Sequence, residues 1–215
     1  MSIPELIIQN IKWANKIDLN DKEFFKLTAT KQNPRYLWVG CSDSRVPETS
    51  LLGLLPGNVF THRNIANQIH TNDKSMLSVV DYAVNSLKIK EIIICGHYNC
   101  GGVAAAFNLD GLKEPLSSWL SNISKSHLDY DMILQKYNSN IDKLNAACRL
   151  NVIQQVINLA QVQLIKECWG NEIECNIHGL IYDVSCGYLH DLDVTVKDND
   201  SLNKLKENIE LKVCI

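Results

Sequence analysis

The chain has 215 residues, 46% of them hydrophobic and 21% charged, with only 10 Gly and 5 Pro, a balance that excludes collagen-like, low-complexity and intrinsically disordered chains. The formal charge is −3, and only four of the 21 basic residues are Arg, so the sequence lacks the positive footprint of a nucleic-acid-binding protein. The length suits one compact domain with an appendage, and we expect residues 1–215 to form a single domain.

No apolar run is long enough to span a bilayer, and the first residues, MSIPELIIQNIKWANK, lack a basic region ahead of the apolar ones. We therefore expect no membrane partner and a cytoplasmic location. The eight cysteines are scattered through a chain that is large enough to fold without disulfides. In a reducing compartment they are expected to be thiols or metal ligands.

The N-terminal segment is predicted to be helical. Ser2 and Glu5 have the spacing of a capping box, and apolar residues follow them at helical intervals. A second short helix is predicted over residues 21–27. Because both helices precede the first strand and need an apolar surface to cover, we expect residues 1–30 to form a helical arm that a neighbouring subunit could cover.

The remaining chain predicts an α/β fold. Short apolar runs begin at Tyr36, surround Val59 and end at Gly96, as is typical of buried parallel strands, and residues 73–88 follow the helical period between the last two runs. A long helix is predicted over 140–169, followed by a fourth strand in IHGLIYDV and an alternating strand in YLHDLDVTV. We expect a mostly parallel central sheet flanked by helices, with an N-terminal helical arm and an antiparallel edge strand.

Two of the predicted strands end in Gly and are followed by reactive side chains. RYLWVG leads into Cys41 and Asp43, and EIIICG leads into His97 and Cys100. Ligand sites of open α/β sheets lie at the carboxyl ends of their strands. In an extended chain Cys41 and Asp43 point the same way, and we expect His97 and Cys100 to share one side of a helical turn. Each pair alone has an ordinary explanation, but their joint placement predicts four side chains that converge.

Two thiolates and an imidazole are a typical ligand set of tetrahedral zinc, whereas iron–sulfur clusters prefer four thiolates. Asp43 is a candidate fourth ligand that can leave the metal and admit water. Arg45, two residues further on, is placed to hold the departed carboxylate through a bidentate pair. The predicted cofactor is therefore Zn2+, with Cys41, Asp43, His97 and Cys100 as its ligands.

The strings CSDSRVP and GHYNCGG, with 56 residues from Cys41 to His97, resemble the two zinc motifs of the β-class carbonic anhydrases. The resemblance extends from about Tyr36 to Leu189 and includes HRNIAN and HGLIYDV. It implies a zinc lyase that reversibly hydrates CO2 to bicarbonate and a proton. It also implies self-association, as a homodimer or a dimer of dimers.

The resemblance further implies roles for individual residues. Cys41, His97 and Cys100 match the permanent zinc ligands of the family, and Asp43 and Arg45 match its catalytic dyad. In this expectation the carboxylate of Asp43, held off the metal by Arg45, orients the nucleophile toward CO2.

One position departs from the family pattern, because Tyr98 stands where Thr is most often expected. Trp38, Arg63 and Tyr182 match a triad that in one subgroup forms a non-catalytic bicarbonate pocket and controls whether Asp43 occupies zinc. This match predicts allosteric inhibition by bicarbonate and by low pH. The alternative is that Trp38 and Tyr182 are core residues and Arg63 is a loop charge.

Other reactive residues are given structural roles. The remaining histidines have no partner at ligand spacing and are expected to be structural or surface residues; they are His62, His70, His127, His178 and His190. Core packing is expected for Cys95, Cys148 and Cys168. Residues proposed to line the cleft are Val46, Tyr82 and Gly102.

Two other functions are compatible with parts of the sequence. A nucleotide-binding α/β enzyme would share the sheet, but no G-x-G-x-x-G and no Walker lysine joins a strand to its helix. A non-enzymatic zinc- or thiol-based regulator would use the same four ligands in a permanently closed site. A CO2 hydration assay with and without a zinc-binding sulfonamide separates the regulator from the lyase.

Overall fold

The computed structural model describes residues 1–214, and the chain divides into two compact units at Asn33–Pro34. The first unit contains α1 (Ile3–Asn20) and α2 (Phe24–Thr30). The backbone N–H of Ser2 donates to the carboxylate of Glu5 at 2.6 Å, as the capping pattern predicts. Within this unit, α1 buries none of its residues.

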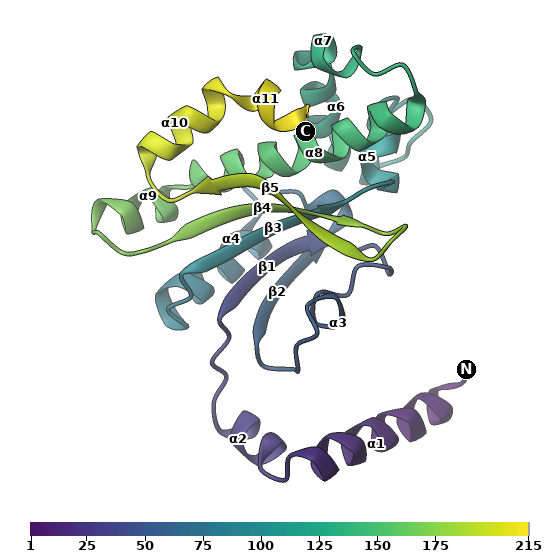
Figure 1. Cartoon of the computed structure of the whole chain (residues 1–215), viewed down its shortest axis with the longest axis vertical. Coiled ribbons are helices and arrows are strands. Elements are labelled where there is room, and N and C mark those ends of the chain that lie inside the picture. The colour runs from purple at the N-terminus through teal and green to yellow at the C-terminus, as the bar shows by residue number, and fades with distance from the viewer. Residues whose placement is uncertain (215) are drawn as a thin grey trace. The chain divides into compact units, whose positions relative to one another are not determined.

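The second unit is built on a five-stranded sheet in the order β2-β1-β3-β4-β5 (Figure 1). The first four strands pair in parallel, and β4 pairs with β5 in antiparallel fashion. The predicted α/β fold with its antiparallel edge strand is confirmed. The strands are β1 (Tyr36–Cys41), β2 (Val59–Asn64), β3 (Glu91–His97), β4 (Asn176–Asp183) and β5 (Tyr188–Val196).

Helices connect and cover these strands (Figure 1). Between β1 and β3 are α3 (Glu48–Leu51), the short 3-10 turn η1 (Ile65–Asn67), α4 (Lys74–Asp81) and the π-helical turn η2 (Tyr82–Ser86). After β3 come α5 (Gly101–Ala105), α6 (Leu116–Asp129), α7 (Asp131–Leu134), α8 (Asn140–Ala160) and α9 (Gln163–Gly170). The described chain ends with α10 (Asn199–Glu207) and α11 (Ile209–Val213).

The single helix predicted over residues 140–169 is wrong. Helix α8 ends at Ala160, and Val162 adopts an extended conformation, with φ −64° and ψ 134°, before α9 begins. The break redirects the chain so that Ile165 and Cys168 of α9 remain buried. Neither Gly nor Pro marks this break in the sequence.

The two faces of the sheet have cores of different size, because alternate strand residues point to opposite faces. The larger core contains Leu37, Val39, Ile92 and Ile94 together with much of α8. The smaller core is centred on Trp38, Val46, Ile93, Cys95 and Tyr182. Burial of Cys95, Cys148 and Cys168 is as expected from the sequence.

Helix α8 contacts the sheet and the η1 segment by two different means. At Gly96 of β3 the helix comes so near that an added Cβ would lie 2.5 Å from Cγ2 of Val152. Beside this contact lies a group of buried amides: Gln68 donates to Asn151 at 2.8 Å, Asn151 donates to the carbonyl of Ala66 at 3.0 Å, and the N–H of Ile69 donates to Gln155 at 2.9 Å. The helix is thus held by both apolar packing and hydrogen bonds.

Within residues 1–214 no helix combines the length and the apolar character needed to cross a membrane.

Candidate metal centre

The candidate site lies where the strand order reverses. Strand β1 has β2 on one side and β3 on the other, so the connections that leave β1 and β3 run in opposite directions. In open α/β sheets such a reversal opens a crevice at the carboxyl ends of the two strands. Cys41 is the last residue of β1 and His97 the last of β3, and both therefore face this crevice.

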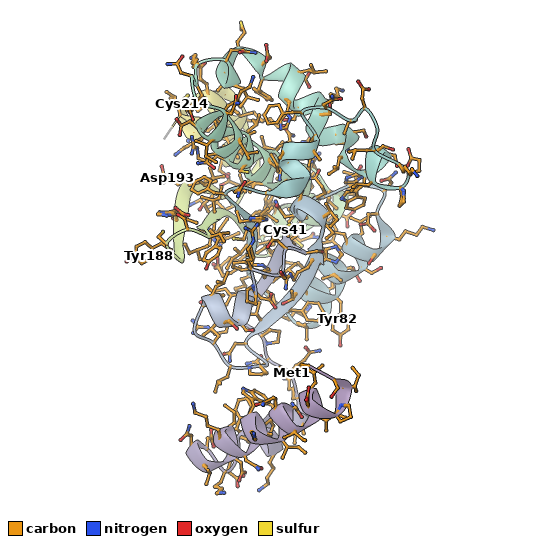
Figure 2. All side chains as sticks on the ribbon, turned by 90° about the vertical axis from the view of Figure 1, so that its right-hand side faces the viewer. Met1, Cys41, Tyr82, Tyr188, Asp193 and Cys214 are labelled. Carbon is orange, nitrogen blue, oxygen red and sulfur yellow. The ribbon has the colours of Figure 1, made fainter. Side chains whose placement is uncertain are left out.

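Three donor side chains meet there. The ligand atoms of Cys41, His97 and Cys100 all lie within 4.8 Å of one another, and all three residues are buried. Figure 2 shows Cys41 surrounded by the side chains of its unit. The turn between His97 and Cys100 is not helical as expected: Asn99 has a φ of 55°, and Cys100 is extended just before α5. This tight turn still directs the Cys100 thiol back toward His97.

The imidazole of His97 is oriented as in a metal site. Its Nδ1 lies 3.0 Å from the carbonyl oxygen of Tyr98, which fixes Nδ1 as the donor and leaves Nε2 as an acceptor. Nε2 is buried and has no hydrogen-bond partner among the described residues. A buried acceptor without a partner, next to two thiols, fits the soft-to-borderline donor set that a tetrahedral divalent metal such as Zn2+ prefers.

The pKa values of the thiols of Cys41 and Cys100 are shifted in opposite directions. The pKa of Cys41 is lowered, first by the neighbouring Cys100 thiol and further by His97 and by the backbone of Asp43 and Ala66, while burial opposes the shift. The pKa of Cys100 is raised, first by the neighbouring Cys41 sulfur and then by burial. The lowered pKa of Cys41 favours its thiolate, the form in which cysteine binds metals.

Asp43 and Arg45 form the bidentate pair that the sequence predicts. Oδ1 of Asp43 accepts from Nε and from the backbone N–H of Arg45, each at 2.9 Å, and Oδ2 accepts from Nη2 at 2.8 Å. These bonds hold the pKa of Asp43 well below its usual range. Oδ2 also lies 3.8 Å from Nε2 of His97, so the carboxylate stands beside the three donors while it is held by Arg45.

The residues matched to a bicarbonate pocket lie in two different environments. Trp38 and Tyr182 pack in the smaller core, and Nε1 of Trp38 is buried without a hydrogen-bond partner among the described residues. Arg63 donates to the backbone carbonyls of Cys41 at 2.8 Å and of Asp43 at 2.6 Å. It therefore supports the backbone of the ligand-bearing loop, a role that the sequence did not reveal.

Tyr98 and Arg149 form a contact that sequence reasoning missed. Arg149 of α8 is buried, donates to the Tyr98 hydroxyl at 3.3 Å, and also donates to the carbonyl of Val213 at 2.8 Å. The sequence signal for this contact was a charged residue between the apolar Ala146–Cys148 and Leu150. Arg149 therefore connects Tyr98, the neighbour of His97, to Val213 at the end of α11.

A cavity of about 380 Å³ adjoins the site and is lined by Arg45, Tyr98, Asn99, Ile141, Asn145, Asp183, Val184 and Ser185. The cleft-lining residues proposed from the sequence are not among them. Tyr82 is 47% exposed and lines a different cavity with Lys74 and Leu164, and Val46 is fully buried in the smaller core. Gly102 packs closely, because an added Cβ would lie 3.0 Å from Ala66 and Ile65.

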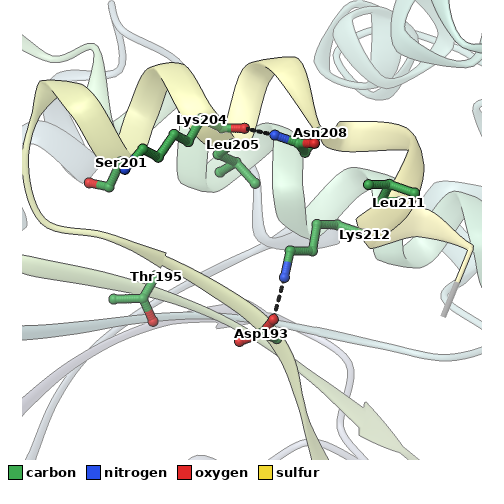
Figure 3. A pocket seen from close by; sticks show the side chains of 8 residues that line it. All are labelled: Asp193, Thr195, Ser201, Lys204, Leu205, Asn208, Leu211 and Lys212. Atoms are coloured by element: carbon green, nitrogen blue, oxygen red, sulfur yellow. Dashed lines mark hydrogen bonds and ion pairs between the residues drawn. The ribbon is translucent and has the colours of Figure 1, made fainter.

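Another cavity, of about 440 Å³, lies between β5 and the C-terminal helices and is shown in Figure 3. Lys212 pairs with Asp193 across it, and Asn208 donates to the carbonyl of Lys204. Its eight lining residues include no His and no Cys. This cavity therefore lacks the thiol and imidazole donors that meet at Cys41.

Comparison with known proteins identifies the family. Residues 36–189 match the sequence profile of the carbonic anhydrase family. The fold also superposes on a structure from Sordaria macrospora, described as a tetrameric β-carbonic anhydrase, with a TM-score of 0.85 and 33% identity over 89% of this chain and 97% of that one. The chain belongs to the β-class carbonic anhydrase family.

Two further relatives support this membership. A carbonic anhydrase of Emericella nidulans is 38% identical over 185 residues, which cover 86% of this chain and 81% of the relative. The Coccomyxa β-carbonic anhydrase in complex with acetazolamide superposes with a TM-score of 0.90 and 27% identity, over 100% of this chain and 99% of that one. The carbonic anhydrase described here is therefore an enzyme of CO2 hydration, and the Cys41–His97–Cys100 group is its candidate metal centre.

Proposed function

We propose that this carbonic anhydrase is a zinc enzyme, with Cys41, His97 and Cys100 as metal ligands and Asp43 and Arg45 as the catalytic dyad. The observation that carries the proposal is the convergence of three buried donors around an unpartnered Nε2 of His97. The chemistry that zinc supplies at such a centre is a nucleophile at neutral pH, since it lowers the pKa of a water from 15.7 to about 7.

The residues around the centre orient that nucleophile. Asp43 is an acceptor at neutral pH because Arg45 keeps its carboxyl ionised. Both carboxylate oxygens are fixed by the Arg45 guanidinium, and Oδ2 is the one nearer to His97. In our proposal Oδ2 accepts a hydrogen bond from the attacking water and directs its lone pair toward CO2. Arg45 is a positioning partner, whose planar fork a lysine could not replace.

Metal content and CO2 hydration rate, measured on matched cysteine variants, test the ligand set. We expect Cys41→Ser to lose zinc and activity together, whereas Cys214→Ser, which alters an exposed cysteine, should keep both. Arg45→Lys should retain zinc but lose at least about tenfold in kcat/KM, because the bidentate pair is replaced by a single contact. Full zinc occupancy in Cys41→Ser would overturn the ligand assignment.

Regulation by bicarbonate and low pH forms a second part of the proposal. Asp43 can pair with Arg45, as it does here, or can occupy the fourth position on the metal. Bicarbonate bound near Arg63 should favour the second arrangement, and by linkage that arrangement should bind bicarbonate more tightly. Lower pH protonates the competing nucleophile, so activity should fall as pH falls. The unpartnered Nε1 of Trp38 supports a polar ligand beside it.

The test of regulation needs two variants, because Arg63 also supports the backbone at Cys41 and Asp43. Arg63→Ala removes these bonds together with any anion contact, whereas Trp38→Phe removes the unpartnered Nε1 and keeps an aromatic ring. Hydration rates are measured against pH, at fixed ionic strength, with and without bicarbonate. We expect both variants to weaken the bicarbonate response. An unchanged response in both would leave Trp38 as a core residue and Arg63 as a backbone support.

Assembly and location complete the proposal. We infer a homodimer or a dimer of dimers, supported by the exposed apolar face of α1 and by the tetrameric description of the Sordaria macrospora relative. A cytoplasmic location is supported by eight cysteines that are all free.

A further inference from the structure

A second group of metal-ligating side chains lies on the hairpin between β4 and β5. The ligand atoms of Asp183, Cys186 and His190 all lie within 4.8 Å of one another. Asp183 ends β4, Cys186 lies in the connecting loop, and His190 is in β5. Asp183 is half-buried, whereas Cys186 and His190 are exposed, so an ion in solution can reach all three. None of them belongs to the centre at Cys41.

The hairpin holds these side chains in place. Asp183 pairs with Tyr188 and Ile181 with His190 in the antiparallel register, which puts His190 diagonally opposite Asp183. The N–H of Gly187, at a φ of 80°, donates to the carbonyl of Asp183 at 2.8 Å and closes the loop. Tyr188, 68% exposed, marks the outer edge of this hairpin in Figure 2.

The carboxylate of Asp183 is already oriented. Its Oδ1 accepts from the backbone N–H of Ser185 at 2.8 Å and from the Ser185 hydroxyl at 2.6 Å. These bonds lower the pKa of Asp183, so that the group is an ionised acceptor. Oδ2 has no hydrogen bond to the described part of the chain and is available to a ligand. Such supporting bonds are the second shell that fixes a ligand in established metal sites.

The donor types select the ion. A thiolate and an imidazole favour Zn2+ and related transition ions over Mg2+ and Ca2+, which prefer oxygen donors. The spacing, two residues between Asp183 and Cys186 and three between Cys186 and His190, lies within the range common in zinc sites. We propose that Asp183, Cys186 and His190 bind a second divalent transition-metal ion of the Zn2+ type, with one coordination position left for water.

This site adjoins the cavity next to the first centre. Asp183 is one of the residues that line the 380 Å³ cavity, together with Arg45 and Tyr98. An ion bound at the hairpin therefore places a divalent positive charge at the wall of the cavity that Arg45 lines.

Cysteine alkylation tests the proposal on the purified protein with its native metal content. Iodoacetamide labelling is followed at each cysteine by peptide mass spectrometry as Zn2+ is added. Among the described residues the exposed cysteines are Cys186 and Cys214, so Cys214 is an internal control. We expect added Zn2+ to slow the alkylation of Cys186 at least about tenfold and to leave Cys214 unchanged. Equal rates at Cys186 with and without Zn2+ would overturn the proposal.

Equilibrium dialysis against Zn2+ measures how many zinc ions each chain binds. We expect the protein to take up one ion per chain beyond its native content, and Cys186→Ser and His190→Gln to weaken this uptake at least about tenfold. Cys214→Ser should bind as the parent chain does. Undiminished uptake by Cys186→Ser, or no extra uptake by the parent chain, would refute the hairpin site. Neither readout depends on hydration activity or on the ligands at Cys41.

Discussion

His127 of α6 is a buried imidazole. Its side chain stacks on Phe107, with the ring centroids 4.1 Å apart, and the residue is only 5% exposed. Neither ring nitrogen has a hydrogen-bond partner among the described residues. The pKa of His127 is lowered to about 4, mainly by burial; the nearby backbone of Ala106 opposes this shift, and the positive charge of Lys143 adds to it. The folded protein therefore holds this imidazole neutral where the unfolded chain would protonate it.

The sign and size of the effect on stability follow from this shift. Between pH 6.5 and pH 4 the unfolded chain binds a proton at His127 that the folded chain does not, so the free energy of unfolding falls as the pH falls through this window. At about 1.36 kcal/mol per pKa unit, the full loss is about 3 kcal/mol, and the loss at pH 5 is about 2 kcal/mol relative to pH 7. The contribution of His127 becomes constant about one pH unit above 6.5.

Urea unfolding at pH 7 and pH 5 measures this contribution. His127→Leu should lose about 2 kcal/mol less than the parent chain between the two pH values, because no group at this position is left to titrate. Lys143→Gln should keep most of the pH dependence, since burial is the larger cause of the shift. The comparison is made at equal zinc content, so that metal loss affects all proteins alike. The same loss in His127→Leu as in the parent chain would refute the reasoning.

Two other predictions concern packing and assembly. Gly96→Ala places a Cβ 2.5 Å from Val152 and should lower the free energy of unfolding by about 1–3 kcal/mol. Urea unfolding measures this loss. A free energy of unfolding equal to that of the parent chain would contradict so close an approach of α8 to β3. Deletion of residues 1–33 removes the exposed apolar face of α1 and should reduce the number of subunits per particle, calculated from the light-scattering mass and the mass of the shortened chain. An unchanged number of subunits would show that the arm does not hold subunits together.

Local patterns were enough to predict the strands and the approach of Cys41 to His97, because Gly-terminated apolar runs report directly on buried parallel strands. Helix α6 was not predicted, although Leu116, Leu120 and Ile123 recur at helical intervals, so the signal was present in the sequence. The helices α10 and α11 carry a similar signal. The break after α8 had no local signal, because neither Gly nor Pro marks it and the helical pattern runs on through the extended Val162.

Polar residues were the harder part of the site. Asn151 and Gln155 are the kind of residues that face water on an amphipathic helix, yet both are buried. Their partners lie more than 80 residues away, in a segment whose path the sequence does not specify. Arg63, for which an anion contact is predicted, also donates to two backbone carbonyls, a contact that depends on the register of β1 with β2 and that no local pattern indicates.

The amides between η1 and α8 set the position of the helix along its own axis. An apolar interface tolerates sliding, but a shift of α8 by one turn, about 5.4 Å, would separate Asn151 and Gln155 from the carbonyl of Ala66 and the N–H of Ile69. Each buried polar group left without a partner costs about 1–3 kcal/mol, so several together approach the stability of a whole domain. Ala66 is buried in the same core as Cys41 and Cys100, and its Cβ packs closely against Gly102 at the start of α5. The register of α8 thereby fixes the place of the η1 segment that packs in one core with the two metal-binding sulfurs, and substitutions that make this interface more apolar would remove that constraint.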